Sequence, residues 1–148
     1  MTNRWLLAVL ALALVPAGVA RADLKAALAE RDLGRRSKLA LDNASSALKE
    51  ARKAFDKGES EKMQSAALEI QESVDLAYDS LKSTGKDPRK SPKWFKQAEI
   101  HTRDLLKKVE TLQYDLNFQD RVVLDKLKAR VQQVHDELLT GLMEGKKK

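Results

Sequence analysis

The regular spacing of apolar residues between Pro92 and Glu144 constrains the fold of this chain more than any other feature of its sequence. Mostly apolar residues recur there at intervals of three and four positions, in two runs: Phe95, Ala98, Thr102, Leu105, Val109, Leu112 and Leu116, then Leu124, Leu127, Val131, Val134, Leu138 and Leu142. This spacing places one apolar stripe along each of two amphipathic helices. We therefore predict a helical hairpin over residues 92–145, with its turn at residues 116–118.

Both helices of this hairpin begin with capping signals. Ser91 is the expected N-cap of the first helix, and Pro92 is its first helical residue, where the missing N–H of proline does no harm. Asn117 is the expected N-cap of the second helix, and Asp120 follows three residues later in an arrangement like a capping box. These signals predict where each helix begins.

A second hairpin is predicted over residues 23–82. Its first helix should run from an N-cap at Asp23 to about Lys57, with a stripe formed by Leu41, Ala44, Leu48, Ala51 and Phe55. Glycine in a helix interior is about 1 kcal/mol less favourable than alanine. We therefore expect either one long helix with a weak point at Gly34 or a break near that residue. Gly58 should end the helix in the left-handed conformation.

The second helix of this hairpin should run from about Ser60 to Lys82. Its stripe has near-ideal spacing and consists of Met63, Ala67, Ile70, Val74, Ala77 and Leu81. Because only a short turn precedes it, this helix must lie antiparallel to the first.

Two such hairpins predict an all-α domain over residues 23–145. A single hairpin leaves its stripe exposed, whereas two hairpins joined by the linker at residues 83–91 bury four stripes in one core. We expect a four-helix up-down bundle, followed by a basic tail at residues 146–148. The alternative is a repeat-like helical array. The turn at residues 54–62 faintly resembles the turn within a tetratricopeptide unit, although the other small and aromatic positions of that motif do not line up.

The N-terminus has the pattern of a secretory signal peptide over residues 1–22. A short positive segment precedes the apolar run Trp5–Val15, and Ala20-Arg21-Ala22 offers a small-x-small cleavage site. The run is shorter than the roughly 20 apolar residues of a membrane-spanning helix. We expect cleavage after Ala22 and export to the periplasm or the extracellular space.

Composition excludes several classes of site and partner. The chain has no cysteine, which excludes disulfides, thiolate metal sites and anchoring through an N-terminal lipidated cysteine. Its formal net charge of +6 would fall to +4 on loss of Arg4 and Arg21 with the signal peptide. A charge this modest, with few aromatic residues, does not predict nucleic-acid binding.

The linker concentrates positive charge. Five basic residues stand in and beside it against a single acid, Asp87: Lys82, Lys86, Arg89, Lys90 and Lys93. The C-terminal lysines Lys146, Lys147 and Lys148 should lie at the same end of the bundle. One interpretation is a solvated loop with ordinary helix-end lysines. The other is a docking patch for an acidic partner or an anionic surface.

Two histidines and one carboxylate form the only candidate metal site. The turn at Asn117 puts position 101 level with about position 133, close to His135, and Asp104 lies one helical turn after His101. His101, Asp104 and His135 together would suit Zn²⁺ or Cu²⁺. The Glu-x-x-His motif of di-metal bundles is missing at both histidines. The alternatives are two packed histidines or a structural, pH-responsive pair.

No catalytic motif is present, so we do not expect an enzyme or a bound cofactor. The chain lacks a nucleophile elbow, an HExxH pair and a glycine-rich phosphate loop, and its carboxylates are scattered over polar faces. We predict an exported helical bundle that interacts with a protein partner, self-associates or scaffolds the cell envelope. The alternatives are a small-ligand or metal carrier using the two histidines and a binder of anionic surfaces through residues 82–93.

Overall fold

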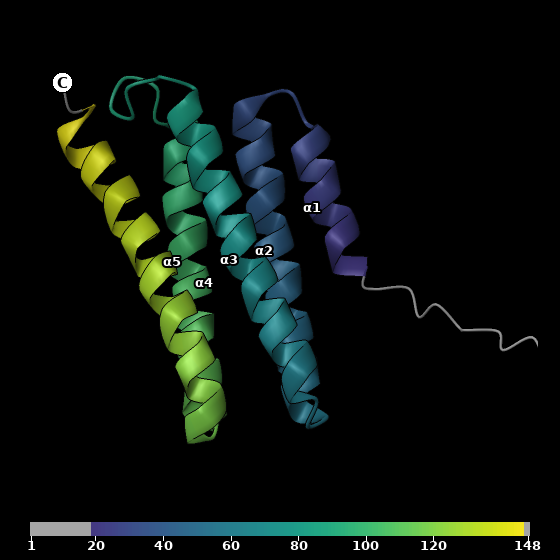
Figure 1. Ribbon diagram of the computed structural model, residues 1–148. Coiled ribbons are helices and arrows are strands. Elements are labelled where there is room, and N and C mark those ends of the chain that lie inside the picture. The colour runs from purple at the N-terminus through teal and green to yellow at the C-terminus, as the bar shows by residue number, and fades with distance from the viewer. Residues whose placement is uncertain (1–18, 147–148) are drawn as a thin grey trace, which may run out of the picture.

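The computed structural model describes the backbone of residues 19–146 and the side chains of residues 24–146. It contains five helices and no strand within that range: α1 (Val19–Ala29), α2 (Leu33–Asp56), α3 (Ser60–Ser83), α4 (Lys93–Asp115) and α5 (Phe118–Glu144) (Figure 1). Residues 1–18 of the predicted signal peptide lie outside the described residues. The described part also has no helix with both the length and the hydropathy needed to cross a membrane.

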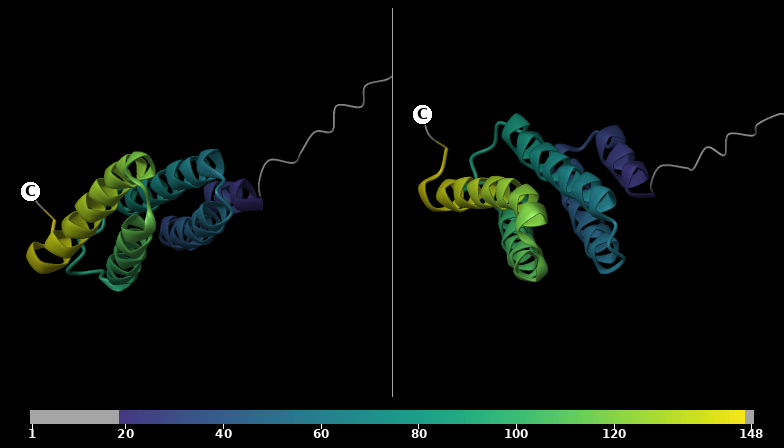
Figure 2. Two further views of the ribbon diagram at one scale, coloured as in Figure 1. Left: turned by 90° about the horizontal axis from the view of Figure 1, so that it is seen from below. Right: turned by 60° about the horizontal axis from the view of Figure 1, so that its bottom comes forward.

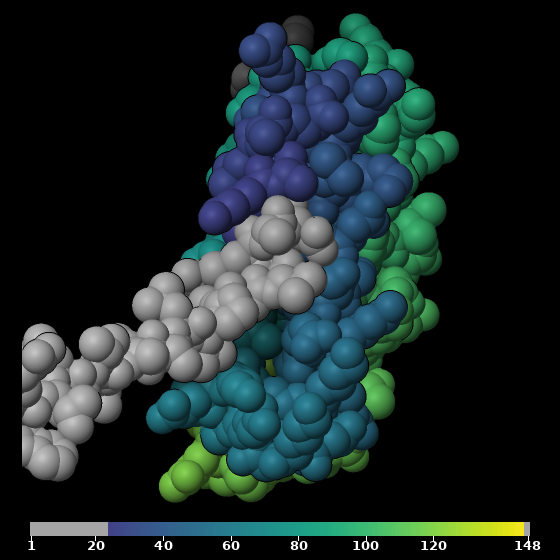
Figure 3. Space-filling model, turned by 90° about the vertical axis from the view of Figure 1, so that its right-hand side faces the viewer, coloured from purple at the N-terminus to yellow at the C-terminus, as the bar shows by residue number. Residues whose placement is uncertain are grey.

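The helices form two hairpins that pack against each other as a bundle. The pairs α2–α3 and α4–α5 lie side by side, with α3 against α5 and α2 against α4 (Figures 1 and 2). The shorter α1 lies on the outer side of α2, at the edge of the molecule (Figure 3). The prediction of an all-α fold is therefore confirmed, while the first predicted helix is divided into α1 and α2.

The division follows from capping around Asp32. Its side-chain Oδ1 accepts a hydrogen bond of 2.8 Å from the Arg35 amide and so begins α2. The Arg36 guanidinium donates to the carbonyl of Glu30, 2.8 Å away, and holds the end of α1 beside this start. A break near Gly34 was one of the two expectations, and it occurs just before that residue. The prediction of Asp23 as an N-cap was wrong, because Asp23 lies inside α1.

Gly34 has a packing reason for its place in a helix. A Cβ atom added there would overlap the indole ring of Trp94, which covers this residue from the start of α4. A larger residue would push the indole away, so Gly34 permits the close approach of the first hairpin to the second.

The apolar stripes form the core as predicted. The stripes of α3 and α4 are buried along their full length, and only Phe55 of α2 and Leu142 of α5 remain partly exposed. A second stripe on α2 consists of buried alanines: Ala40, Ala44, Ala47, Ala51 and Ala54. Small side chains allow neighbouring helices to approach closely. The backbone of α2 accordingly makes its most extensive approach to α3.

The two hairpin turns meet at the end of the bundle opposite the linker. Gly58 has φ of +72° and ends the turn after α2, as predicted. Asn117 caps α5, since its Oδ1 accepts from the Asp120 amide at 2.9 Å. Arg52 bonds Asp115 at 2.6 Å and ties one turn to the other. The loops at the other end, including the linker, are thereby separated from both turns by the length of the bundle.

Two buried polar side chains of the first hairpin each have an oxygen without a hydrogen-bond partner among the described residues. Ser37 is 2% exposed, and its hydroxyl has no hydrogen-bond partner among the described residues. Asn43 donates to Ser73 Oγ at 2.9 Å across α2 and α3, but its own Oδ1 has no such partner there.

Candidate functional site

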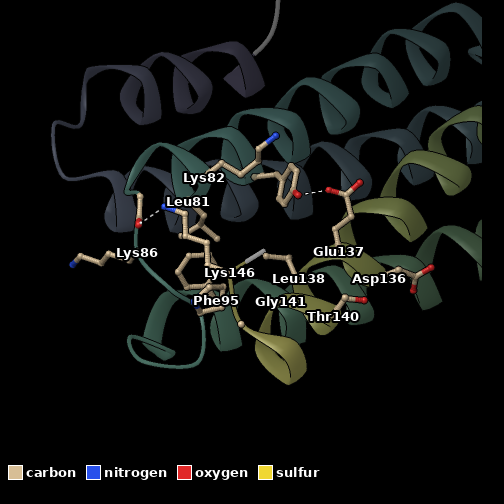
Figure 4. A pocket seen from close by; sticks show the side chains of 14 residues that line it. Leu81, Lys82, Lys86, Phe95, Asp136, Glu137, Leu138, Thr140, Gly141 and Lys146 are labelled. Atoms are coloured by element: carbon tan, nitrogen blue, oxygen red, sulfur yellow. Dashed lines mark hydrogen bonds between the residues drawn. The ribbon is translucent and has the colours of Figure 1, made fainter. Parts of the chain in front are cut away.

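A cavity of about 650 Å³ opens at the linker end of the bundle. It lies between the end of α3, the linker and the last turns of α5, and most of its lining is apolar (Figure 4). Leu81, Phe95 and Leu138 supply buried apolar side chains from three helices. The volume falls within the range of about 300–1,000 Å³ that is usual for small-molecule sites.

The linker is an ordered turn. Thr84 Oγ1 donates to the carbonyl of Leu81 at 2.7 Å, and Gly85 with φ of +65° then turns the chain away from α3. The Asp87 carboxylate accepts from the Arg89 amide at 2.8 Å. This backbone hydrogen bond lowers the pKa of Asp87. The prediction of Ser91 as the N-cap of α4 was wrong, because Pro92 holds that position, with helical dihedral angles, and no side chain caps the start of the helix.

The C-terminal end of α5 packs onto this turn. Lys146 Nζ donates to the carbonyl of Gly85 at 3.2 Å. Gly145 is buried against Asp87 and Arg89, and a Cβ at Gly141 would lie 3.2 Å from Pro88 Cγ. The structure thus brings Lys146 and the linker together at one end of the bundle. Lys147 and Lys148 lie outside the described residues.

Six basic residues surround the cavity or stand on the linker, and we call them the basic linker end: Lys82, Lys86, Arg89, Lys90, Lys93 and Lys146. All six side chains are exposed. Within residues 24–146 none of them forms an ion pair with a carboxylate, whereas Lys38, Lys108 and Arg130 each do so. Lys82 and Lys93 instead stand over the rings of Tyr78 and Trp94, at 5.1 and 4.8 Å from the ring centroids.

The opposite wall of the cavity is acidic, but its carboxylates are already engaged. Tyr78 donates a very short hydrogen bond to Glu137, which lowers the pKa of Glu137, and burial raises the pKa of Tyr78. Gln133 also donates to Glu137, at 3.0 Å. Asp136 accepts from Gln132 at 2.8 Å. The cavity therefore has an acidic side on α5, satisfied within the protein, and a cationic side on the linker.

Lys86 and Phe95 also line a smaller hollow of about 190 Å³ beside the large cavity. Ser91 and Trp94 also line this hollow. The linker residues thus border open space on both sides. A group bound at the main cavity would be in direct contact with the linker.

The three candidate metal ligands have separate partners. His101 Nε2 is 2.8 Å from Ser45 Oγ on α2, and burial lowers the pKa of this histidine. Asp104 pairs with Lys108 at 2.8 Å, which lowers the pKa of Asp104. His135 Nε2 lies 3.0 Å from Glu99 Oε1. In the described part of the chain, no group of three or more His, Cys, Asp or Glu side chains is arranged to hold a metal ion.

Sequence reasoning missed the cavity itself. Its floor residues were recognised as core, and its rim residues as basic, but nothing in the pattern placed them around one space. One signal was available: Gly141 and Gly145 stand four residues apart at the end of the last predicted helix. Paired glycines at this spacing indicate that another segment approaches the helix closely. In the structure that segment is the linker, with Pro88 beside Gly141 and with Asp87 and Arg89 beside Gly145.

No protein-family model matches the chain. No curated protein sequence matches it either.

Proposed function

We propose that this chain is an exported, non-enzymatic binding protein and that it binds a negatively charged partner at the basic linker end. The observation that carries this proposal is the position of six exposed basic side chains around an apolar cavity, without carboxylate partners in residues 24–146. Elsewhere in residues 24–146, eight of the other eighteen basic residues lie within ion-pair distance of a carboxylate, Lys38, Arg52 and Lys108 among them. Uncompensated charge beside a cavity favours an anionic ligand.

Binding is a better account of this site than chemistry. The Tyr78 hydroxyl and the Glu137 carboxylate bond each other, and a low pKa keeps Glu137 ionised. Catalytic acids and bases need a pKa near the working pH. The remaining polar side chains of the lining are lysines, Asp136 and Thr140. They can hold and orient a ligand but include no nucleophile paired with a base.

Export rests on the N-terminal sequence pattern and is part of the proposal. Cleavage after Ala22 would leave residues 23–29 of α1 on the domain, where Ala27 is fully buried. Sequencing of the mature N-terminus is the direct test: we expect Asp23 as the first residue of protein recovered from the periplasm or the medium. Recovery of only the intact chain from inside the cell would refute export.

Site-specific photo-crosslinking in living cells tests the binding surface. A photoreactive residue at position 86 or 90 should capture a partner, and the same residue at position 49 or 126 should not. Lys49 and Lys126 are matched controls, because they are exposed lysines without a carboxylate partner in the described residues. Capture should also fall with the triple change Lys86→Glu, Arg89→Glu and Lys90→Glu. Equal capture from all four positions would refute the proposed surface.

A further inference from the structure

We infer that the cavity at the basic linker end binds a single-chain amphiphile, an alkyl chain with a carboxylate or similar small anionic head. This inference deepens the proposed function and rests on it. The alkyl chain would lie on the apolar floor formed by Leu81, Phe95 and Leu138. The anionic head would lie at the linker side of the opening, between Lys86 and Lys146 (Figure 4).

The division of charge around the opening sets the direction of the ligand. Lys86 lies on the side of the linker, whereas Asp136 and Glu137 lie on the opposite side, on α5 (Figure 4). An anionic head is repelled by the α5 side and attracted by the linker side. Lys146 approaches the same side, because its Nζ contacts the Gly85 carbonyl. Both lysines are exposed, so they can reorient toward a bound head group.

The polar groups of the cavity favour an alkyl chain over a polypeptide. A bound peptide brings backbone N–H and C=O groups, each of which must find a hydrogen-bond partner when it leaves water. Tyr78 and Glu137 are hydrogen-bonded to each other, and Asp136 Oδ1 already accepts from Gln132. Thr140 is the remaining hydroxyl in the lining. Methylene groups need no such partners, so they lose nothing in this environment.

A flat anionic surface is also a poorer match. A surface would contact the exposed lysines but would leave a cavity of about 650 Å³ empty. A discrete amphiphile uses both features, since its head meets the lysines and its chain removes apolar surface from water.

The test is calorimetric titration of the protein, isolated from cells that express the complete chain, with alkyl carboxylates of increasing length below their micelle concentrations. Affinity should rise about tenfold for each two added methylene groups until the cavity is full. Alkyl trimethylammonium ions of the same lengths should bind at least tenfold more weakly. Equal affinity for the cationic series, or affinity without chain-length dependence, would overturn the inference.

Two variants separate the head from the chain. Lys86→Gln with Lys146→Gln should weaken every carboxylate about equally and leave the dependence on chain length intact. Thr140→Phe places a ring at the cavity wall and should shorten the longest chain that still gains affinity. The controls are Lys49→Gln with Lys126→Gln, and Thr111→Phe on the exposed surface of α4. No difference between test and control variants would refute the assigned site.

The outcome also separates this inference from the proposed function. If no alkyl chain binds, but crosslinking at positions 86 and 90 still captures a partner in a charge-dependent way, the inference fails and the proposed function stands. The inference is overturned if an acidic peptide binds saturably, with higher affinity than the alkyl carboxylates, and displaces them in competition. A polypeptide would then be the occupant of the cavity. Failure of both experiments would refute the proposed function as well.

Discussion

The contact between Gly34 and Trp94 predicts that alanine at position 34 destabilises the protein, which is the opposite of what helix propensity alone predicts. Replacing a helical glycine by alanine normally stabilises a protein by up to about 1 kcal/mol. At Gly34 the new Cβ would overlap three atoms of the indole ring, which is a rigid group and has no flexible end that could move aside. Overpacking of this kind costs about 1–3 kcal/mol. We therefore expect Gly34→Ala to lower the free energy of unfolding by about 1–2 kcal/mol.

A double-mutant cycle makes this prediction specific. In a Trp94→Ala background the collision is absent, so Gly34→Ala should leave the free energy of unfolding unchanged or raise it by up to about 1 kcal/mol. The difference between the two backgrounds, about 1–3 kcal/mol, measures the coupling of the two residues. Gly141→Ala is the matched control. Its Cβ would lie 3.2 Å from Pro88 Cγ, a tight contact without overlap, and we expect a change of less than about 1 kcal/mol.

The measurement is urea unfolding followed by far-UV circular dichroism, with all variants compared at one temperature. A change of 1 kcal/mol corresponds to roughly 2–4 °C in Tm for a domain of about this size. The reasoning is refuted if Gly34→Ala is neutral or stabilising in the wild-type background. It is refuted equally if the substitution has the same effect whether or not Trp94 is present.

Three further predictions concern single residues. Burial lowers the pKa of His101 from its ordinary 6.5, so the unfolded chain takes up a proton at a higher pH than the folded chain and the free energy of unfolding decreases as the pH falls below about 6.5. His101→Gln should reduce the decrease measured between about pH 7.5 and about pH 5.5. An unchanged decrease would contradict this. Ser37→Ala removes a buried hydroxyl without a hydrogen-bond partner in the described residues and should raise the free energy of unfolding in urea by about 1 kcal/mol; a decrease would show that the hydroxyl is satisfied. Asp32→Ala and Asn117→Ala each remove a helix cap and should each lower Tm by an amount equivalent to about 1 kcal/mol, whereas serine at either position should restore most of it.

Helix bounds and core positions were predictable because they depend on local periodicity and capping. The predicted starts and ends of α3, α4 and α5 agree with the structure to within two residues. Every stripe residue assigned to α3 and α4 is buried. The break between α1 and α2 was only half predictable, since Gly34 indicated a weak point but did not show that Asp32 would begin a new helix there.

The histidine prediction shows which part of tertiary structure the sequence does not determine. Position 101 was expected level with about position 133, and the observed contact between Glu99 and His135 agrees with that axial level. The rotation of α4 was not predictable in the same way. It turns His101 toward Ser45 on α2, because packing against the first hairpin fixes which side of the helix faces α5. The cavity was not predicted for the same reason, because which side chains line it depends on the rotations of α3 and α5 about their axes.

The contrast between the two hairpin cores has a consequence for how this protein can change in sequence over time. The alanines of this stripe are 0–3% exposed, so a larger residue there would overpack the core. The core of α4 and α5 is built from leucine and valine, for which swaps that conserve volume usually cost less than about 1.5 kcal/mol. Under neutral drift, the second hairpin should therefore diversify faster than the first. Distant homologues should be easier to align through the small residues of α2 than through the regular stripes of α4 and α5.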